Sequence, residues 1–215
     1  MRYPVMVFDF DGTLADSYAE GVAIFQRIGP ELGITILEGD ELEAARALPT
    51  RQFLKKVGVS LWKLPRVIRA YQAAAAETAH TLKLFAGIFE SLNQLHADGV
   101  RLGILSSNRE DTIRTCLRAN DVEHLFEFVI GYPKLFGKGR ALRRLMKERQ
   151  IARTDLLYIG DESRDVIAAR KARVEIAAVA WGFQTESILR ETGATTVLHK
   201  PEQLLDVVPT HQMGI

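Results

Sequence analysis

The chain has 215 residues, 47% of them hydrophobic and 26% charged, a length and composition that allow a full hydrophobic core. Its formal net charge of +1 gives no reason to expect nucleic acid or an anionic membrane as a partner. The chain has a single cysteine, Cys116, which excludes an internal disulfide framework and fits a reducing compartment. The sequence shows neither the apolar core of a signal peptide nor an apolar run long enough to span a membrane. We therefore expect a cytoplasmic protein.

The first expected element is a buried strand over residues 4–10, because this run is short and apolar and leads into a turn. From Asp16 onward the composition changes to alanine, leucine and charged residues at helical spacing. Asp16 or Ser17 can cap a helix that runs to about Gly33. Three further helices are expected in this stretch, at about 40–47, 50–57 and 63–80.

After this helical stretch, strands and helices alternate. Strands are expected at 100–106, 126–130, 156–160, 175–180 and 195–198. Helices are expected at 87–97, 109–119, 139–150, 163–172, 184–191 and 201–207. The alternation predicts an α/β fold, a Rossmann-like three-layer core with a parallel sheet covered on both faces. Residues 1–15 and 83–215 would form this core, and residues 16–82 would form an all-helical insertion.

Polar side chains follow several of the expected strands at their carboxyl ends, where open parallel sheets bind ligands. In chain order they are Asp9 and Asp11, then Ser106, Ser107 and Asn108, then Lys134 and Lys138, and finally Asp161, Glu162 and Asp165. Residues two apart in a strand point the same way, so Asp9 and Asp11 converge and need a cation or a shared proton between them. Carboxylates, a hydroxyl and an ammonium around one crevice suit Mg²⁺ and a phosphate group.

Each of these residues taken alone also has a purely structural explanation. The aspartate pair is often a turn, Ser106 is a common way to end a strand, and Asp161 is a common N-cap. Lys138 would then be a surface lysine, although a helix N-terminus slightly disfavours a cation. The combination favours a site, because suitable groups follow four separate elements of one predicted sheet.

Three segments together resemble the haloacid dehalogenase superfamily. They are Asp9-Phe10-Asp11-Gly12-Thr13-Leu14-Ala15-Asp16-Ser17, then Leu105-Ser106-Ser107-Asn108, then Gly160-Asp161-Glu162-Ser163-Arg164-Asp165, with Lys138 between the last two. The segment from Ala178 to Phe183 is similar to that of the phosphoglycolate phosphatase-like group. The resemblance implies that residues 16–82 are a small helical cap over the catalytic core.

The resemblance implies a Mg²⁺-dependent phosphatase that hydrolyses a small phosphorylated metabolite. Asp9 would attack phosphorus and form an aspartyl-phosphate, and Asp11 would protonate the leaving oxygen and then activate water. Ser106 and Lys138 would hold the phosphoryl oxygens. Further substrate-binding candidates are Gly12, Thr13, Ser107, Asn108 and, in the cap, Arg51.

The implied metal site consists of Asp9, the backbone carbonyl of Asp11, and Asp161, with Asp165 orienting a metal-bound water. The role of Glu162 stays open, because it occupies a variable position of the motif. Lys134 competes with Lys138 for the phosphate-binding role. We prefer Lys138, because Gly-Lys at a helix start resembles the phosphatase subgroup.

Several alternatives differ in chemistry. A phosphomutase of the β-phosphoglucomutase type would need cap residues for a second anion, and the candidates are Arg46, Arg51, Lys55 and Lys56. A dehalogenase needs neither the second aspartate nor Mg²⁺, and a P-loop is excluded by its glycine spacing. A phospho-receiver-like regulatory protein would be shorter. The sequence leaves open whether the protein is a monomer or a dimer. Trp62 is expected to pack in the cap, and Trp181 to border the site.

Overall fold

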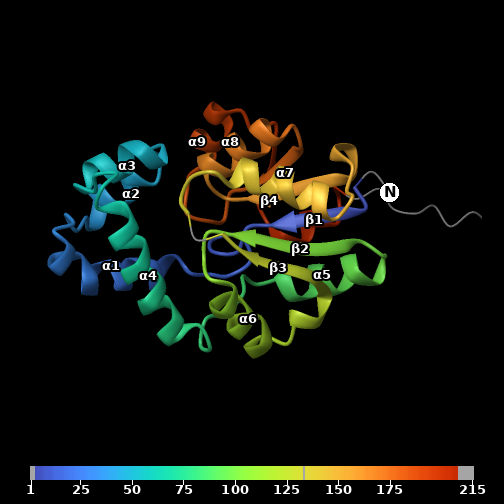
Figure 1. The fold of residues 1–215 in the computed structure, drawn as a ribbon, viewed down its shortest axis with the longest axis horizontal. Helices are drawn as coiled ribbons and strands as arrows, with labels where there is room; N and C mark the ends of the chain where they lie inside the picture. The colour runs from blue at the N-terminus through green and yellow to red at the C-terminus, as the bar shows by residue number, and fades with distance from the viewer. Residues whose placement is uncertain (1–2, 133, 208–215) are drawn as a thin grey trace, which may run out of the picture.

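The computed structural model describes residues 3–132 and 134–207, so the two ends of the predicted core lie outside it. Its centre is a parallel six-stranded sheet with the strand order β3-β2-β1-β4-β5-β6 (Figure 1). The strands are β1 (Val5–Phe8), β2 (Arg101–Ser106), β3 (Phe126–Gly131), β4 (Leu156–Gly160), β5 (Glu175–Val179) and β6 (Thr196–Leu198). The order reverses between β1 and β4, because β2 and β3 lie on one side of β1 and the later strands on the other.

Helices cover both faces of the sheet, as Figure 1 shows. One face carries α5 (Ile88–Ala97) and α6 (Glu110–Ala119), and the other carries α7 (Lys138–Glu148), α8 (Ser163–Ala172) and α9 (Glu186–Thr192). Alternate residues of β1 point to opposite faces of the sheet. Met6 and Phe8 pack in the hydrophobic cluster under α5 and α6, and Val5 and Val7 pack in the cluster under α7, α8 and α9. The predicted three-layer α/β core is therefore confirmed.

Four helices between β1 and α5 form a separate group, which we call the helical lobe. They are α1 (Tyr18–Leu32), α2 (Gly39–Ala45), α3 (Thr50–Lys56) and α4 (Leu64–Thr78), and they lie to the left of the sheet in Figure 1. The lobe has its own hydrophobic cluster, which includes Ile34, Val57 and Val67. Leu135 and Phe136, from the loop that follows β3, pack against this cluster and tie the lobe to the core.

The differences from the sequence predictions are local. The first strand ends at Phe8 rather than at residue 10, because the backbone turns and the N–H groups of Thr13, Leu14 and Ala15 donate to Phe10. The last expected helix is a short 3₁₀ turn, η3 (Pro201–Leu204). Trp62 does not pack in the lobe as expected, because it lies before α4 with 95% of its surface exposed. Within the described residues, no helix combines the length and apolar character needed to cross a bilayer.

Candidate active site

The carboxyl ends of β1, β2 and β4 lie side by side at the point where the strand order reverses. Phe8 pairs with Ile104 of β2 on one side and with Ile159 of β4 on the other. Asp9 therefore emerges between the ends of these two strands, close to Ser106 and Gly160. Open parallel sheets bind ligands in the crevice at such a reversal, so the topology places the predicted polar residues in a suitable position.

Asp9 is a buried carboxylate that is already paired with a lysine. Its Oδ1 accepts a hydrogen bond from the Phe10 N–H at 2.7 Å, and its Oδ2 accepts one from Lys138 Nζ at 2.6 Å. Burial by itself would raise the pKa of Asp9, but the Lys138 and Arg164 charges outweigh burial and hold that pKa below its ordinary value. Asp9 is therefore ionised at neutral pH, the form that a nucleophile requires.

Lys138 joins Asp9 to Asp165. Lys138 is the first residue of α7 and follows Gly137. Its Nζ donates a hydrogen bond to Asp165 Oδ1 at 2.7 Å. Asp165 also accepts hydrogen bonds from the Tyr158 hydroxyl and, through Oδ2, from the Glu162 N–H at 3.2 Å each. Burial opposes the Lys138 charge, but the two carboxylates raise its pKa. Asp9, Lys138 and Asp165 thus form one buried, charged unit.

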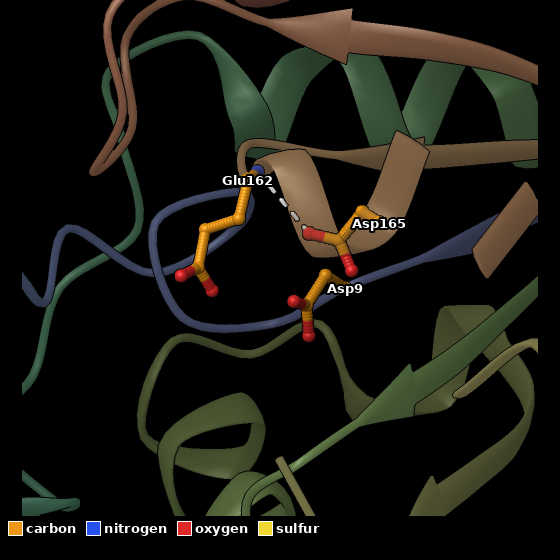
Figure 2. A group of neighbouring side chains, drawn as sticks. All are labelled: Asp9, Glu162 and Asp165. Carbon is orange, nitrogen blue, oxygen red and sulfur yellow. Dashed lines mark hydrogen bonds between the residues drawn. The ribbon is translucent and has the colours of Figure 1, made fainter. Parts of the chain in front are cut away.

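Three carboxylates converge in a way that suits a metal ion. Asp9, Glu162 and Asp165 each offer an oxygen atom, and these atoms lie within 4.8 Å of one another (Figure 2). Carboxylate oxygens are the ligands that Mg²⁺ prefers. Asp161, which the sequence places among the metal ligands, directs its oxygens elsewhere: Oδ1 accepts from Thr13 Oγ1 and Oδ2 from the Phe183 N–H, both at 2.8 Å.

The charge balance of the site also fits a divalent cation. Five acidic groups gather here, namely Asp9, Asp11, Asp161, Glu162 and Asp165, against the cations Lys138 and Arg164. Burial, followed by the charges of the neighbouring acids, raises the pKa of Asp161 well above its ordinary value. Both causes disfavour the ionised carboxylate of Asp161 when no cation is near it. A cation bound among these oxygens would stabilise their ionised form.

Asp11 lies at the boundary between the core and the helical lobe. Its Oδ2 accepts a hydrogen bond from Asn108 Nδ2 at 3.0 Å. Burial, and then the charge of Asp9, raise the pKa of Asp11 to about 6. Asp9 and Asp11 therefore differ in the direction of their pKa shifts, one lowered and one raised. When the pKa values of two neighbouring carboxyl groups differ in this way, one group can act as the nucleophile and the other as the acid and base.

The loop after β2 supplies hydroxyl and amide groups beside the two aspartates. Ser106 is fully buried, and its Oγ accepts from the Asn108 N–H at 3.2 Å. Ser107 Oγ accepts from Arg164 Nη1 at 3.1 Å. Arg164, whose guanidinium also pairs with Glu162, is a site residue that the sequence reasoning did not select. Its position one residue before Asp165 in the third motif could have identified it.

The turn after β1 packs directly against Asp161. Gly12 has a φ of +73°, and a Cβ at this position would meet the carboxylate of Asp161 and lie 2.9 Å from Phe183 Cδ1. Only glycine fits both the backbone conformation and the space. Trp181 Nε1 donates to the Thr13 carbonyl at 3.1 Å, so Trp181 borders the site as expected.

The two remaining predicted residues lie further away. Lys134 is exposed, with its ammonium 5.7 Å from the centre of the Tyr132 ring. Arg51 is also exposed, and its guanidinium lies over the ring of Phe136. Arg46, which the sequence named only as a rival candidate, instead reaches the core: its Nε donates to the Phe183 carbonyl and its Nη2 to that of Gly182, both at 3.0 Å.

Comparisons with known proteins give a consistent result. Residues 6–179 match the family model described as haloacid dehalogenase-like hydrolase. A phosphoglycolate phosphatase from Synechococcus elongatus is 32% identical over 203 residues, which cover 94% of this chain and 96% of that protein. A Mycobacterium tuberculosis protein named tyrosine-protein kinase PtkA is 29% identical, over 91% of this chain and 68% of that protein. A predicted phosphatase from Clostridium acetobutylicum has a similar fold, with a TM-score of 0.81, 23% identity and coverage of 96% and 98%.

Proposed function

Because the chain belongs to the haloacid dehalogenase-like hydrolase family, in its phosphoglycolate phosphatase-like group, we propose that it is a Mg²⁺-dependent phosphatase acting on a small phosphomonoester. The observation that carries the proposal is the buried Asp9 carboxylate, held ionised by Lys138 beside an acid with a raised pKa. The free, buried Cys116 fits a protein of the cytoplasm, where thiols stay reduced.

In the first half of the reaction, an oxygen of Asp9 attacks the phosphorus atom of the substrate. The new bond from Asp9 oxygen to phosphorus forms as the bond to the leaving oxygen breaks, which gives an aspartyl-phosphate. Lys138 can remain beside Asp9 and offset the charge on the phosphoryl oxygens. The buried hydroxyl of Ser106, at the end of β2, can donate a hydrogen bond to an oxygen of the same phosphoryl group.

Asp11 is suited to move the proton in both halves. With a pKa of about 6 it is present in both protonation states near neutral pH. Protonated Asp11 donates to the leaving oxygen, and the resulting carboxylate then takes a proton from the water that attacks the aspartyl-phosphate. Asn108 holds Asp11 in place from the β2 side through the 3.0 Å hydrogen bond.

The carboxylates of Asp9, Glu162 and Asp165 are the groups that would hold Mg²⁺, together with Asp161 if its side chain turns away from Thr13. When bound, Mg²⁺ would supply positive charge that stabilises the phosphoryl oxygens. Glu162 thereby gains a role that the sequence left open.

A phosphomutase is the second candidate. Unlike a phosphatase, it requires cationic side chains in the lobe that bind a second phosphate group of the substrate. The lobe candidates do not support it. Arg51 lies over Phe136, and the donors of Arg46 are taken by Gly182, Phe183 and Glu43. Lys55 and Lys56 are exposed and do not line the cavity beside Asp11. Incubation with a hexose 1-phosphate, followed by product analysis, separates the two functions. Free phosphate indicates a phosphatase, and hexose 6-phosphate indicates a mutase.

The proposed function is tested by phosphate release from ethyl phosphate and p-nitrophenyl phosphate, with Mg²⁺ and with a chelator. We expect Asp9→Asn to lose activity by at least about 1,000-fold, whereas Asp98→Asn, at an exposed residue just after α5, keeps it. Asp11→Asn should accumulate protein that carries one phosphoryl group on the peptide containing Asp9, measured by mass spectrometry after an acid quench. Near-normal turnover in Asp9→Asn, or full activity in the chelator, would contradict the proposal.

A further inference from the structure

A cavity of about 280 Å³ lies where the helical lobe meets the core, and it is lined mainly by apolar side chains. Most of these come from the lobe and include Val22 and Phe25 of α1, Leu42 and Ala45 of α2, and Val67 of α4. We call this space the lobe cavity. An apolar cavity of about 150 Å³ accommodates a benzene molecule, so the lobe cavity has room for an apolar group of about ten carbon atoms.

The lobe cavity is continuous with the active site. Asp11, Ser107, Asn108 and Arg164 line it on the core side. The leaving oxygen of a phosphomonoester must lie beside Asp11 to receive its proton. The chain attached to that oxygen therefore points into the lobe cavity.

The lobe cavity offers no unengaged cation for a second anionic group. Among the described residues that line it, the cationic side chains are Arg46 and Arg164. Arg46 donates to Gly182, Phe183 and Glu43. Arg164 pairs with Glu162 and donates to Ser107. A carboxylate or second phosphate on the leaving group would lose its hydration here without gaining a counter-ion, which is costly.

Two lining hydroxyl groups have no hydrogen-bond partner within the described part of the chain. They are Tyr18 Oη and Thr50 Oγ1, and both atoms are buried. A buried hydroxyl without a partner costs free energy, and such groups are satisfied by a ligand or by water. An occupant with an apolar body and a hydroxyl or carbonyl group would satisfy both the apolar lining and these two side chains.

We propose that the lobe cavity binds the leaving group of the substrate, and that this group is neutral, mainly apolar and much larger than glycolate. The inference rests on the proposed phosphatase function, and it specifies the substrate class. Val22, Ala45 and Thr50 then determine specificity without taking part in the chemistry. The favoured substrates are phosphomonoesters of alcohols that have about six to ten carbon atoms and a hydroxyl or carbonyl group.

The first test uses wild-type protein and a series of straight-chain alkyl phosphates from ethyl to decyl, below their micelle concentrations, with phosphoglycolate as the anionic comparison. Burial of one methylene group contributes about 0.8 kcal/mol, which corresponds to about a fourfold effect. We expect kcat/KM to rise by up to about fourfold per methylene as far as roughly octyl phosphate, and octyl phosphate to exceed phosphoglycolate by at least about 100-fold. Dissociation constants for the same series, measured calorimetrically on Asp9→Asn, should follow the same trend without any turnover.

Two variants of α1 provide a matched pair. Val22→Phe places a ring in the lobe cavity and should reduce the octyl-to-ethyl ratio of kcat/KM by at least about tenfold, because the lost volume corresponds to several methylene groups. Ala23→Phe adds the same ring on the exposed side of α1 and should leave the ratio unchanged. Thr50→Val should lower the preference for hydroxylated chains over plain chains of equal length.

The outcomes separate the two proposals. If ethyl phosphate is hydrolysed but neither kcat/KM nor the dissociation constant improves with chain length, or if phosphoglycolate is preferred, the lobe-cavity proposal is wrong and the phosphatase function stands. If no phosphomonoester is hydrolysed, the proposed function is wrong, and the dissociation constants still decide whether the lobe cavity binds apolar chains.

Discussion

The Lys138 ammonium lies 2.6 Å from an oxygen of Asp9, although the two residues are 129 positions apart in the chain. Both side chains are almost completely buried, at 4% and 1% exposure. This contact requires the first residue of α7 to approach the end of β1, so it exists only when the sheet is assembled. It joins the nucleophile of the proposed reaction to the lysine that we propose binds the phosphoryl group.

Replacing Lys138 tests this contact. Lys138→Met leaves the buried carboxylates of Asp9 and Asp165 without their shared partner, so we expect stability to fall by about 3–5 kcal/mol. The activity should fall by about 100-fold or more, because one charged donor to the phosphoryl group is lost. Urea unfolding and phosphate release measure the two effects. Lys134→Ala is the control and should change neither, because Lys134 is exposed; equal losses in both variants would contradict the assignment.

Gly12 provides a test of the close packing against Asp161. Gly12→Ala adds a Cβ where the Asp161 carboxylate lies, at a φ of +73°. Gly39→Ala is the control for backbone strain alone, because Gly39 has a φ of +52° and no atom within 4 Å of an added Cβ. We expect urea unfolding to show a loss of about 1 kcal/mol for Gly39→Ala and at least about twice that for Gly12→Ala. Equal losses would show that the packing against Asp161 is loose.

Arg46 fastens α2 to the core through the carbonyl groups of Gly182 and Phe183. Arg46→Ala removes both hydrogen bonds, each contributing about 1.5–3 kcal/mol because the donor is charged. We expect amide hydrogen exchange in α2 and in residues 182–185 to accelerate by at least about tenfold, with a higher KM. Glu43→Gln is the control, since Glu43 contacts Arg46 only on the surface. Unchanged exchange in Arg46→Ala would mean that other contacts hold the lobe.

Cys116 gives a prediction for pH dependence away from the acidic cluster. Burial, and then the charge of Asp11, raise the pKa of the Cys116 thiol from 9.0 to about 12. Between these values the unfolded chain loses the thiol proton while the folded chain keeps it, so this stabilising contribution is present below pH 9 and is lost as the pH rises towards 12. Wild type should lose up to about 1.4 kcal/mol per pH unit more than Cys116→Ala over this window. Parallel pH profiles of unfolding free energy would contradict the shift.

The same burial predicts low reactivity of this thiol. Folded protein at pH 8 should react with iodoacetamide far more slowly than urea-unfolded protein, because the thiolate is the reactive form. Mass spectrometry of the peptide that contains Cys116 measures the rate. Labelling at equal rates in the two states would show that α6 opens readily.

Local patterns were sufficient for the layout of the core. The apolar runs that became β1, β2 and β4 are short and end in turns. They predicted buried strands with Ser106 at the end of β2 and with Asp9 and Asp161 just beyond β1 and β4. The prediction was less accurate where local pattern and tertiary contact compete. The strand run continued to residue 10 in the sequence, but the turn around Gly12 ends β1 at Phe8. Trp62 was expected to pack in the cap because it is large and apolar, yet it lies exposed before α4.

The amino-acid pattern was sufficient to predict the parallel α/β core and the acids at the strand ends, because the periods of strands and helices and the residues that end them are local properties. Which distant side chains meet depends instead on tertiary packing. It placed Lys138 rather than Lys134 against Asp9, and Arg46 rather than Arg51 against the core. These choices depend on where α7 and α2 pack, and that packing comes from buried contacts between segments far apart in the chain. The lobe cavity beside Asp11 is decided in the same way, since its lining comes from several helices at once.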